Sequence, residues 1–109
     1  MATDAAFALE PFARYQSLER GASPNTVAAY QRDLRHLVDF LEGQGVASPA
    51  GATAAVLREF VFRLKDLGLA PTSIRRHISA VRSYYRFLAG EGLVVRDPTD
   101  RLTSPKKWR

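Results

Sequence analysis

The chain has 109 residues, of which 46% are hydrophobic and 25% charged, and such values are typical of a single soluble globular domain. It has no cysteine, which excludes disulfides, thiolate zinc sites and a cysteine nucleophile and fits a cytoplasmic protein. No apolar run approaches the roughly 20 residues that span a bilayer. Since only two histidines, His36 and His77, are present and they lie far apart, we do not expect a His-rich metal site. We also expect no cofactor.

The net charge of +5 is unevenly distributed. Residues 1–66 hold seven Lys or Arg against eight Asp or Glu, whereas residues 67–109 hold nine against three. A basic half of this kind favours a polyanionic partner, such as nucleic acid or an acidic membrane surface. A basic surface that serves only solubility explains the charge equally well.

Glycine and proline divide the chain into four long stretches, each with the apolar spacing of a helix and without the alternation of a strand. We therefore expect an all-α fold, a small four-helix bundle with short connections. The four predicted helices run approximately from Phe7 to Arg20, from Pro24 to Gly43, from Thr53 to Gly68 and from Pro71 to Gly90.

Capping residues mark several of these boundaries. Ser23 before Pro24 is a typical helix start, and Thr53 is a candidate N-cap for the third helix. Asp97 followed by Pro98 predicts one short extra helical turn through Leu102. The final residues, S-P-K-K-W-R, show no periodicity and are interpreted as an extended basic tail or linker.

The fourth predicted helix has two contrasting faces. Its core-facing side is an apolar seam, formed by Ile74, Ile78, Val81, Tyr85 and Leu88. At about 100° per residue, the opposite side combines guanidinium groups with small hydroxyls and has no carboxylate: Thr72, Arg75, Arg76, Ser79, Arg82, Ser83 and Arg86. Arginine grips phosphate or guanine in a bidentate way, and hydroxyls donate to phosphate. The face predicts nucleic-acid binding, although an ordinary solvated face is the alternative.

Other candidates are weaker. The start of the second helix, with Asn25 and Thr26, presents N–H groups suited to phosphate, but simple capping also explains it. Lys106, Lys107 and Arg109 either contact a phosphate backbone or belong to a flexible linker.

Other residues are given structural roles. We interpret Arg32, Asp33 and Arg35 as a mixed-charge surface and Tyr30 as part of the core. Tyr84 and Tyr85 are interpreted as packing residues and not as nucleophiles. Neither histidine suggests a local site, and each is interpreted as a surface or partly buried residue. No catalytic motif is present.

Three segments in order resemble one known family. S-P-N-T-V-A-A-Y-Q-R-D-L (Ser23 to Leu34) and T-S-I-R-R-H-I-S-A-V-R-S-Y-Y-R-F-L (Thr72 to Leu88) resemble helices of the Xer-type and phage-integrase-like tyrosine recombinases. D-P-T-D-R-L-T-S-P-K (Asp97 to Lys106) resembles the segment that leads into their catalytic domain. The resemblance covers nearly the whole chain, from about Leu9 onward, and implies the N-terminal core-binding, SAM-like domain.

The resemblance implies a partner and a set of contacts. In the family this domain and a catalytic domain clamp duplex DNA, so we expect double-stranded DNA as the partner. Carried over, the contacts are Asn25, Thr26, Thr72, Ser73, Arg76, Ser79 and Arg82, to which the spacing argument adds Arg75 and Arg86. Lys106 and Lys107 complete the predicted site. Residues 1–103 would form the domain and residues 104–109 the start of a linker to a catalytic domain that is absent here.

The family's catalytic residues, an Arg, Lys, His, Arg, His or Trp and a nucleophilic Tyr, belong to that other domain. We therefore expect the present chain to bind DNA and not to cut it, within a parent that resolves chromosome dimers or acts as an integrase. An alternative is a helical bundle for protein–protein interaction, which would assemble recombinase subunits into a tetramer on DNA. A membrane-surface helix is disfavoured because the basic helix also carries a complete core seam.

Overall fold

The computed structural model describes residues 6–104. Its elements follow one another as α2 (Leu9–Leu18), α3 (Pro24–Gly43), a short 3-10 helix η1 (Pro49–Gly51), α4 (Ala54–Asp66) and α5 (Pro71–Gly90). The fold class is therefore all-α, as predicted, with four α-helices in the described part of the chain. The chain divides after Gly51 into two compact units, each of which contains one pair of α-helices.

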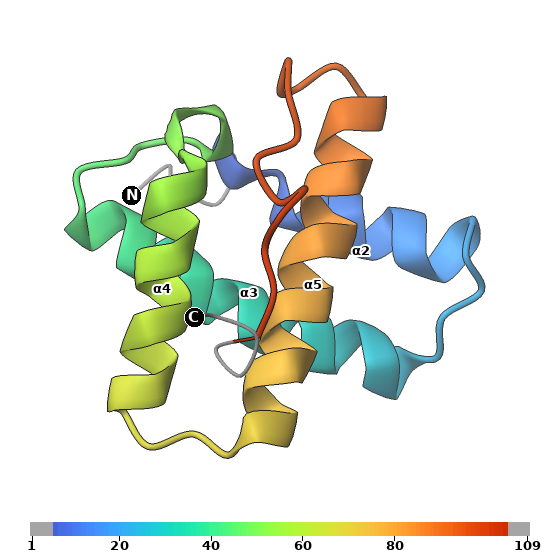
Figure 1. The fold of residues 1–109 in the computed structure, drawn as a ribbon. Helices are drawn as coiled ribbons and strands as arrows, with labels where there is room; N and C mark the ends of the chain where they lie inside the picture. The colour runs from blue at the N-terminus through green and yellow to red at the C-terminus, as the bar shows by residue number, and fades with distance from the viewer. Residues whose placement is uncertain (1–5, 105–109) are drawn as a thin grey trace. The chain divides into compact units, whose positions relative to one another are not determined.

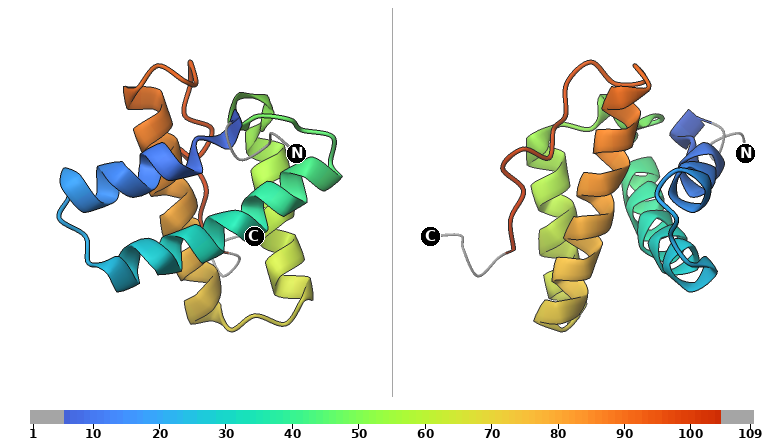
Figure 2. Two further views of the ribbon diagram at one scale, coloured as in Figure 1. Left: turned by 180° about the vertical axis from the view of Figure 1, so that it is seen from behind. Right: turned by 90° about the vertical axis from the view of Figure 1, so that its right-hand side faces the viewer.

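The first unit is an antiparallel helix pair, α2 and α3, joined by a short loop (Figures 1 and 2). Helix α3 begins as predicted, because the Ser23 hydroxyl accepts a hydrogen bond from the Thr26 N–H at 3.1 Å and Pro24 occupies the first turn. Helix η1 was not expected from the sequence.

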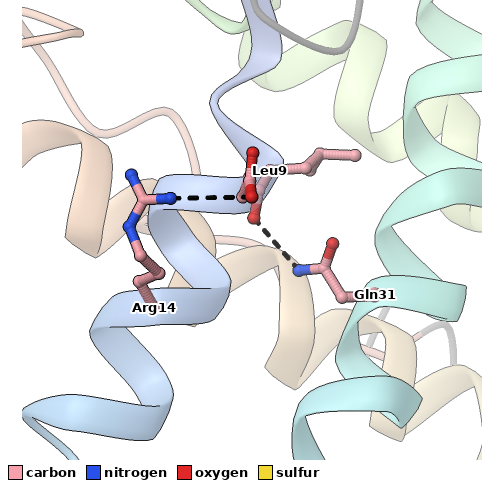
Figure 3. A network of polar contacts seen from close by, with 4 residues as sticks. Leu9, Arg14 and Gln31 are labelled. Atoms are coloured by element: carbon pink, nitrogen blue, oxygen red, sulfur yellow. Dashed lines mark hydrogen bonds and ion pairs between the residues drawn. The ribbon is translucent and has the colours of Figure 1, made fainter.

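Apolar side chains hold the first unit together. Phe12 of α2 is 1% exposed, and its ring stacks on Tyr30 of α3 with centroids 6.4 Å apart. Figure 3 shows Gln31 of α3 reaching across to α2, where its Nε2 donates to the Leu9 carbonyl at 3.3 Å. The rest of the α3 core stripe has no exposed surface: Leu34, Leu37, Val38 and Leu41.

The second unit is also built on an antiparallel helix pair, α4 and α5 (Figure 1). Thr53 caps α4 as predicted, with its hydroxyl accepting from the Val56 N–H at 3.1 Å. The predicted seam of α5 is buried along its whole length, and so are Leu57, Phe60, Val61 and Leu64 of α4. His77 of α5 meets the Phe60 ring edge-on at a centroid distance of 6.2 Å.

After α5 the chain reverses and runs back beside that helix (Figure 1, orange to red). Gly92 permits the reversal, because its φ of 74° lies in a region that favours glycine. We name residues 93–104 the returning segment. Val94, Thr99 and Leu102 anchor it, with 5%, 2% and 3% of their surfaces exposed.

The extra helical turn expected after Asp97 is a hydrogen-bonded turn over residues 98–101 and not a helix of its own. Asp97 caps it as predicted, since Oδ1 accepts from the Thr99 N–H at 2.8 Å and from its hydroxyl at 2.6 Å. Only one turn closes, through the Leu102 N–H to the Thr99 carbonyl at 3.0 Å.

Three interpretations of single residues were wrong. Asp33 lies within the core and not on a mixed-charge surface, because only 2% of it is exposed. His77, expected at or near the surface, is also 2% exposed. Tyr30 is half-buried, where full burial was expected.

Candidate nucleic-acid interface

The side of α5 opposite its seam is open to solvent along most of its length. Helix α5 contains no Asp or Glu among its 20 residues, so no i,i+4 ion pair within the helix neutralises its arginines. Ser73 and Ser83 are half-buried at the edges of this face. The exposed members, which we call the α5 face, are Thr72, Arg75, Arg76, Ser79 and Arg86.

Arg82 belongs to the same helix but has a different environment. It is half-buried, and its Nη1 donates to the Leu102 carbonyl at 2.8 Å and reaches the Thr99 carbonyl at 3.5 Å. At about 100° per residue, Arg82 lies beside Ile78 at the border of the α5 face, where the returning segment runs. The spacing argument grouped it with exposed residues because that segment is distant in sequence.

The returning segment adds two hydroxyl groups to this border. Thr103 and Ser104 line an open hollow of about 240 Å³ together with Arg75, Ile78 and Ser79 of α5. The sequence-based site did not include Thr103 or Ser104. Their position directly after the capped turn at Asp97 is the signal that could have found them, because a capped turn fixes the direction of the chain that follows it.

The other predicted contacts belong to the first unit or fall outside the described residues. Asn25 and Thr26 are both exposed at the start of α3, in the first unit. The Thr26 hydroxyl accepts a hydrogen bond from Ser23 at 3.0 Å, so capping engages part of this cluster. Lys106 and Lys107 lie outside the described residues.

The tyrosines of α5 pack in the core, as predicted. Tyr84 and Tyr85 have no exposed surface, and their rings meet edge-on with centroids 5.2 Å apart. Burial raises the pKa of both phenols, and the nearby Asp97 carboxylate raises the pKa of Tyr85 further. A raised pKa leaves less phenolate at neutral pH, and both side chains are buried, so neither residue is placed for attack on a substrate.

Residues 6–104 lack the features of a metal site and of a membrane span. No group of His, Asp and Glu side chains there has the arrangement of a metal site. None of the helices within that range has the length and apolar character needed to cross a membrane.

Fold and charge together define an all-α domain whose last helix exposes arginines and hydroxyls without a carboxylate. The family model described as phage integrase, N-terminal SAM-like domain, matches residues 9–92. The chain belongs to this family, and it is thereby placed among the N-terminal domains of Xer-type tyrosine recombinases, as the sequence motifs indicated.

Individual relatives agree with this assignment. The chain is 38% identical over 98 residues to the tyrosine recombinase XerC of Roseiflexus castenholzii, covering 90% of the chain and 31% of the relative. It is 41% identical over 101 residues to the tyrosine recombinase XerD of Rhizobium meliloti, covering 93% and 32%. It is 40% identical over 109 residues to XerD of Brucella suis, covering 100% and 35%.

The chain thus spans about a third of the length of the curated relatives it matches. The matched family model is that of the N-terminal domain and not of a catalytic domain. No solved structure matches the chain.

Proposed function

We propose that this chain is a duplex DNA-binding domain that positions a site-specific tyrosine recombinase on its recombination half-site. The observation that carries the proposal is the α5 face, which presents Arg75, Arg76 and Arg86 beside the exposed hydroxyls of Thr72 and Ser79. Arginine suits both the bidentate edge of guanine in the major groove and the phosphate backbone. Membership of the recombinase family supports DNA as the polyanion in question.

The remaining predicted contacts have supporting roles in this proposal. Asn25 and Thr26 would present the start of α3 to phosphate, where unpaired backbone N–H groups favour an anion. Ser73 lies at the edge of the α5 face, and Lys106 and Lys107 would follow the DNA backbone. Arg82 would act through the returning segment, given the two carbonyls that its guanidinium contacts.

In this proposal the chain binds DNA and does not cut it. The parent would exchange strands through a 3′-phosphotyrosyl intermediate with no metal or nucleotide, using catalytic residues outside these 109 positions. Other recombinase subunits would be further partners of the parent, in a tetramer on DNA. The parent's role would lie in resolving chromosome dimers or in DNA integration, and it would act in the cytoplasm.

Single substitutions on the α5 face test the proposal. Arg75→Ala, Arg76→Ala and Arg86→Ala are each compared with wild type by fluorescence anisotropy, on a labelled Xer-type half-site duplex and on a scrambled duplex. A base contact should cost about 1–3 kcal/mol on the half-site alone, whereas a phosphate contact should weaken both duplexes and flatten the salt slope by about one.

Arg58→Ala is the matched control, because Arg58 is an exposed arginine on α4 that belongs to no proposed contact. It removes the same charge and should change half-site affinity much less than the α5 variants. If all three α5 variants bind both duplexes like the control, the α5 face is not the DNA-binding surface.

The alternative of a protein-interaction domain has one observation in its favour. Helix α4 and the residue that caps its C-terminus expose two large apolar side chains, Phe62 at 42% and Leu67 at 66%. Sedimentation of the chain without DNA over a range of concentrations separates the two functions. Self-association that Phe62→Ser abolishes would favour assembly, whereas a monomer at all concentrations would favour DNA binding alone.

A further inference from the structure

The hollow between α5 and the returning segment has the chemistry of an anion site. Its polar groups are one guanidinium, on Arg75, and three hydroxyls, on Ser79, Thr103 and Ser104, while Ile78 supplies an apolar wall. Among residues 6–104, no carboxylate lines it. At about 30 Å³ for each water molecule, a volume of about 240 Å³ has room for a phosphate group and several waters.

A second hollow, in the first unit, differs in its charge. Its lining mixes the Glu10 carboxylate with the guanidinium groups of Arg14 and Arg35. Glu10 forms an ion pair with Arg14 at 3.7 Å, so this arginine is already neutralised. An anion would meet a carboxylate there, which makes the hollow beside α5 the better anion site.

One wall of the hollow beside α5 is held in place by a chain of polar contacts. Asp97 accepts two hydrogen bonds from Thr99 and so shapes the turn over residues 98–101. Arg82 then fixes the end of that turn to α5 through its hydrogen bond to the Leu102 carbonyl at 2.8 Å. Leu102 itself is buried. Since Thr103 and Ser104 follow directly, their place beside Arg75 depends on this attachment.

We infer that the hollow binds a single phosphodiester of the DNA backbone, and that Arg82 is a positioning residue that holds the wall formed by Thr103 and Ser104. The inference rests on the proposed DNA-binding function and adds a site and a role to it. Arg75 supplies the charge, and the hydroxyls of Ser79 and Ser104 donate to the phosphate oxygens. Arg82 contributes without touching the phosphate.

The first experiment maps the phosphate. Half-site duplexes are made with one neutral methylphosphonate linkage at each backbone position in turn, and their affinities for the 109-residue chain are measured by anisotropy. We expect one linkage at which neutralisation weakens wild type about tenfold and weakens Arg75→Ala and Ser104→Ala much less, because these variants have already lost that contact. Ser17→Ala, on the exposed surface of α2, is the matched control and should retain the wild-type pattern.

The second experiment tests the role of Arg82 without DNA. Loss of the hydrogen bond from Arg82 to the Leu102 carbonyl should speed hydrogen exchange at the Leu102 amide about tenfold or more in Arg82→Ala, while the amides of the buried seam of α5 exchange as in wild type. The same variant should bind the half-site about five- to tenfold more weakly, and adding Ser104→Ala should cause little further loss, because the two changes remove one contact. Direct phosphate binding by Arg82 would leave the Leu102 amide unchanged.

The outcomes separate this inference from the function on which it rests. If wild type binds neither duplex, the proposed function fails and the inference fails with it. If wild type prefers the half-site but no single linkage depends on Arg75 and Ser104, the function stands and the phosphate site is wrong. An unchanged Leu102 amide in Arg82→Ala overturns the positioning role alone.

Discussion

Because Tyr84 and Tyr85 are buried in the core of the second unit, its free energy of unfolding depends on pH. Both are fully buried, and burial raises the pKa of both phenols. In the unfolded chain a tyrosine loses its proton near pH of about 10. Above that pH the unfolded state binds fewer protons than the folded state, so the free energy of unfolding falls as pH rises.

We therefore expect Tyr84 and Tyr85 to ionise only when the protein unfolds. The measurement is an alkaline titration that follows phenolate absorbance and helical circular dichroism together. Subtracting the titration of a Tyr84→Phe/Tyr85→Phe variant isolates the two residues. Their phenolate signal should rise with the loss of helicity, and a signal that rises while the helices are intact would show that the phenols are accessible to solvent.

Capping residues show what local sequence determines at the scale of single elements. The Thr53 hydroxyl satisfies one of the free N–H groups in the first turn of α4. We expect Thr53→Ala to lower the free energy of unfolding by about 1 kcal/mol, since it leaves that group without its side-chain acceptor. Urea denaturation measures the change.

Thr53→Ser is the control, because serine keeps the hydroxyl and is at least as good a cap. It should remain within a few tenths of a kcal/mol of wild type. If serine and alanine destabilise equally, the capping hydrogen bond makes no net contribution and the loss comes from the methyl group of threonine.

The parts of the fold that depend on neighbouring residues could be predicted, whereas those that depend on distant packing could not. The caps at Ser23, Thr53 and Asp97 follow from neighbours within three residues, and the structure places all three as expected, although Asp97 caps a turn and not a helix. The seam of α5 follows from periodicity. The burial of Asp33 and His77 could not be predicted, because it depends on packing that a single charged or imidazole side chain does not reveal.

For the site, sequence reasoning found the exposed α5 residues but not their border. Helical spacing predicts which residues share a face, and Arg75, Arg76, Ser79 and Arg86 are exposed as that spacing requires. It does not predict which part of the face another segment covers. Both this spacing and the family resemblance grouped Arg82 with the DNA contacts, and neither predicted that its guanidinium would contact the Thr99 and Leu102 carbonyls.

At the scale of the whole molecule, charge is concentrated where the proposed function needs it. Residues 67–109, which include α5 and the returning segment, hold nine Lys or Arg against three Asp or Glu. A charge excess of this kind attracts any polyanion and gives a strong dependence on salt. Sequence preference needs contacts with base edges in addition, and these are what separate a recombinase half-site domain from a general basic surface.

One measurement tests this central claim directly: the affinity of the 109-residue chain for a labelled Xer-type half-site and for a scrambled duplex of equal length, by anisotropy across a salt series. We predict tighter binding to the half-site at every salt concentration, with the logarithm of affinity falling against the logarithm of salt at a slope of about −2 to −4. Equal affinities for the two duplexes would contradict a role in half-site recognition, and no binding at low salt would contradict DNA binding altogether.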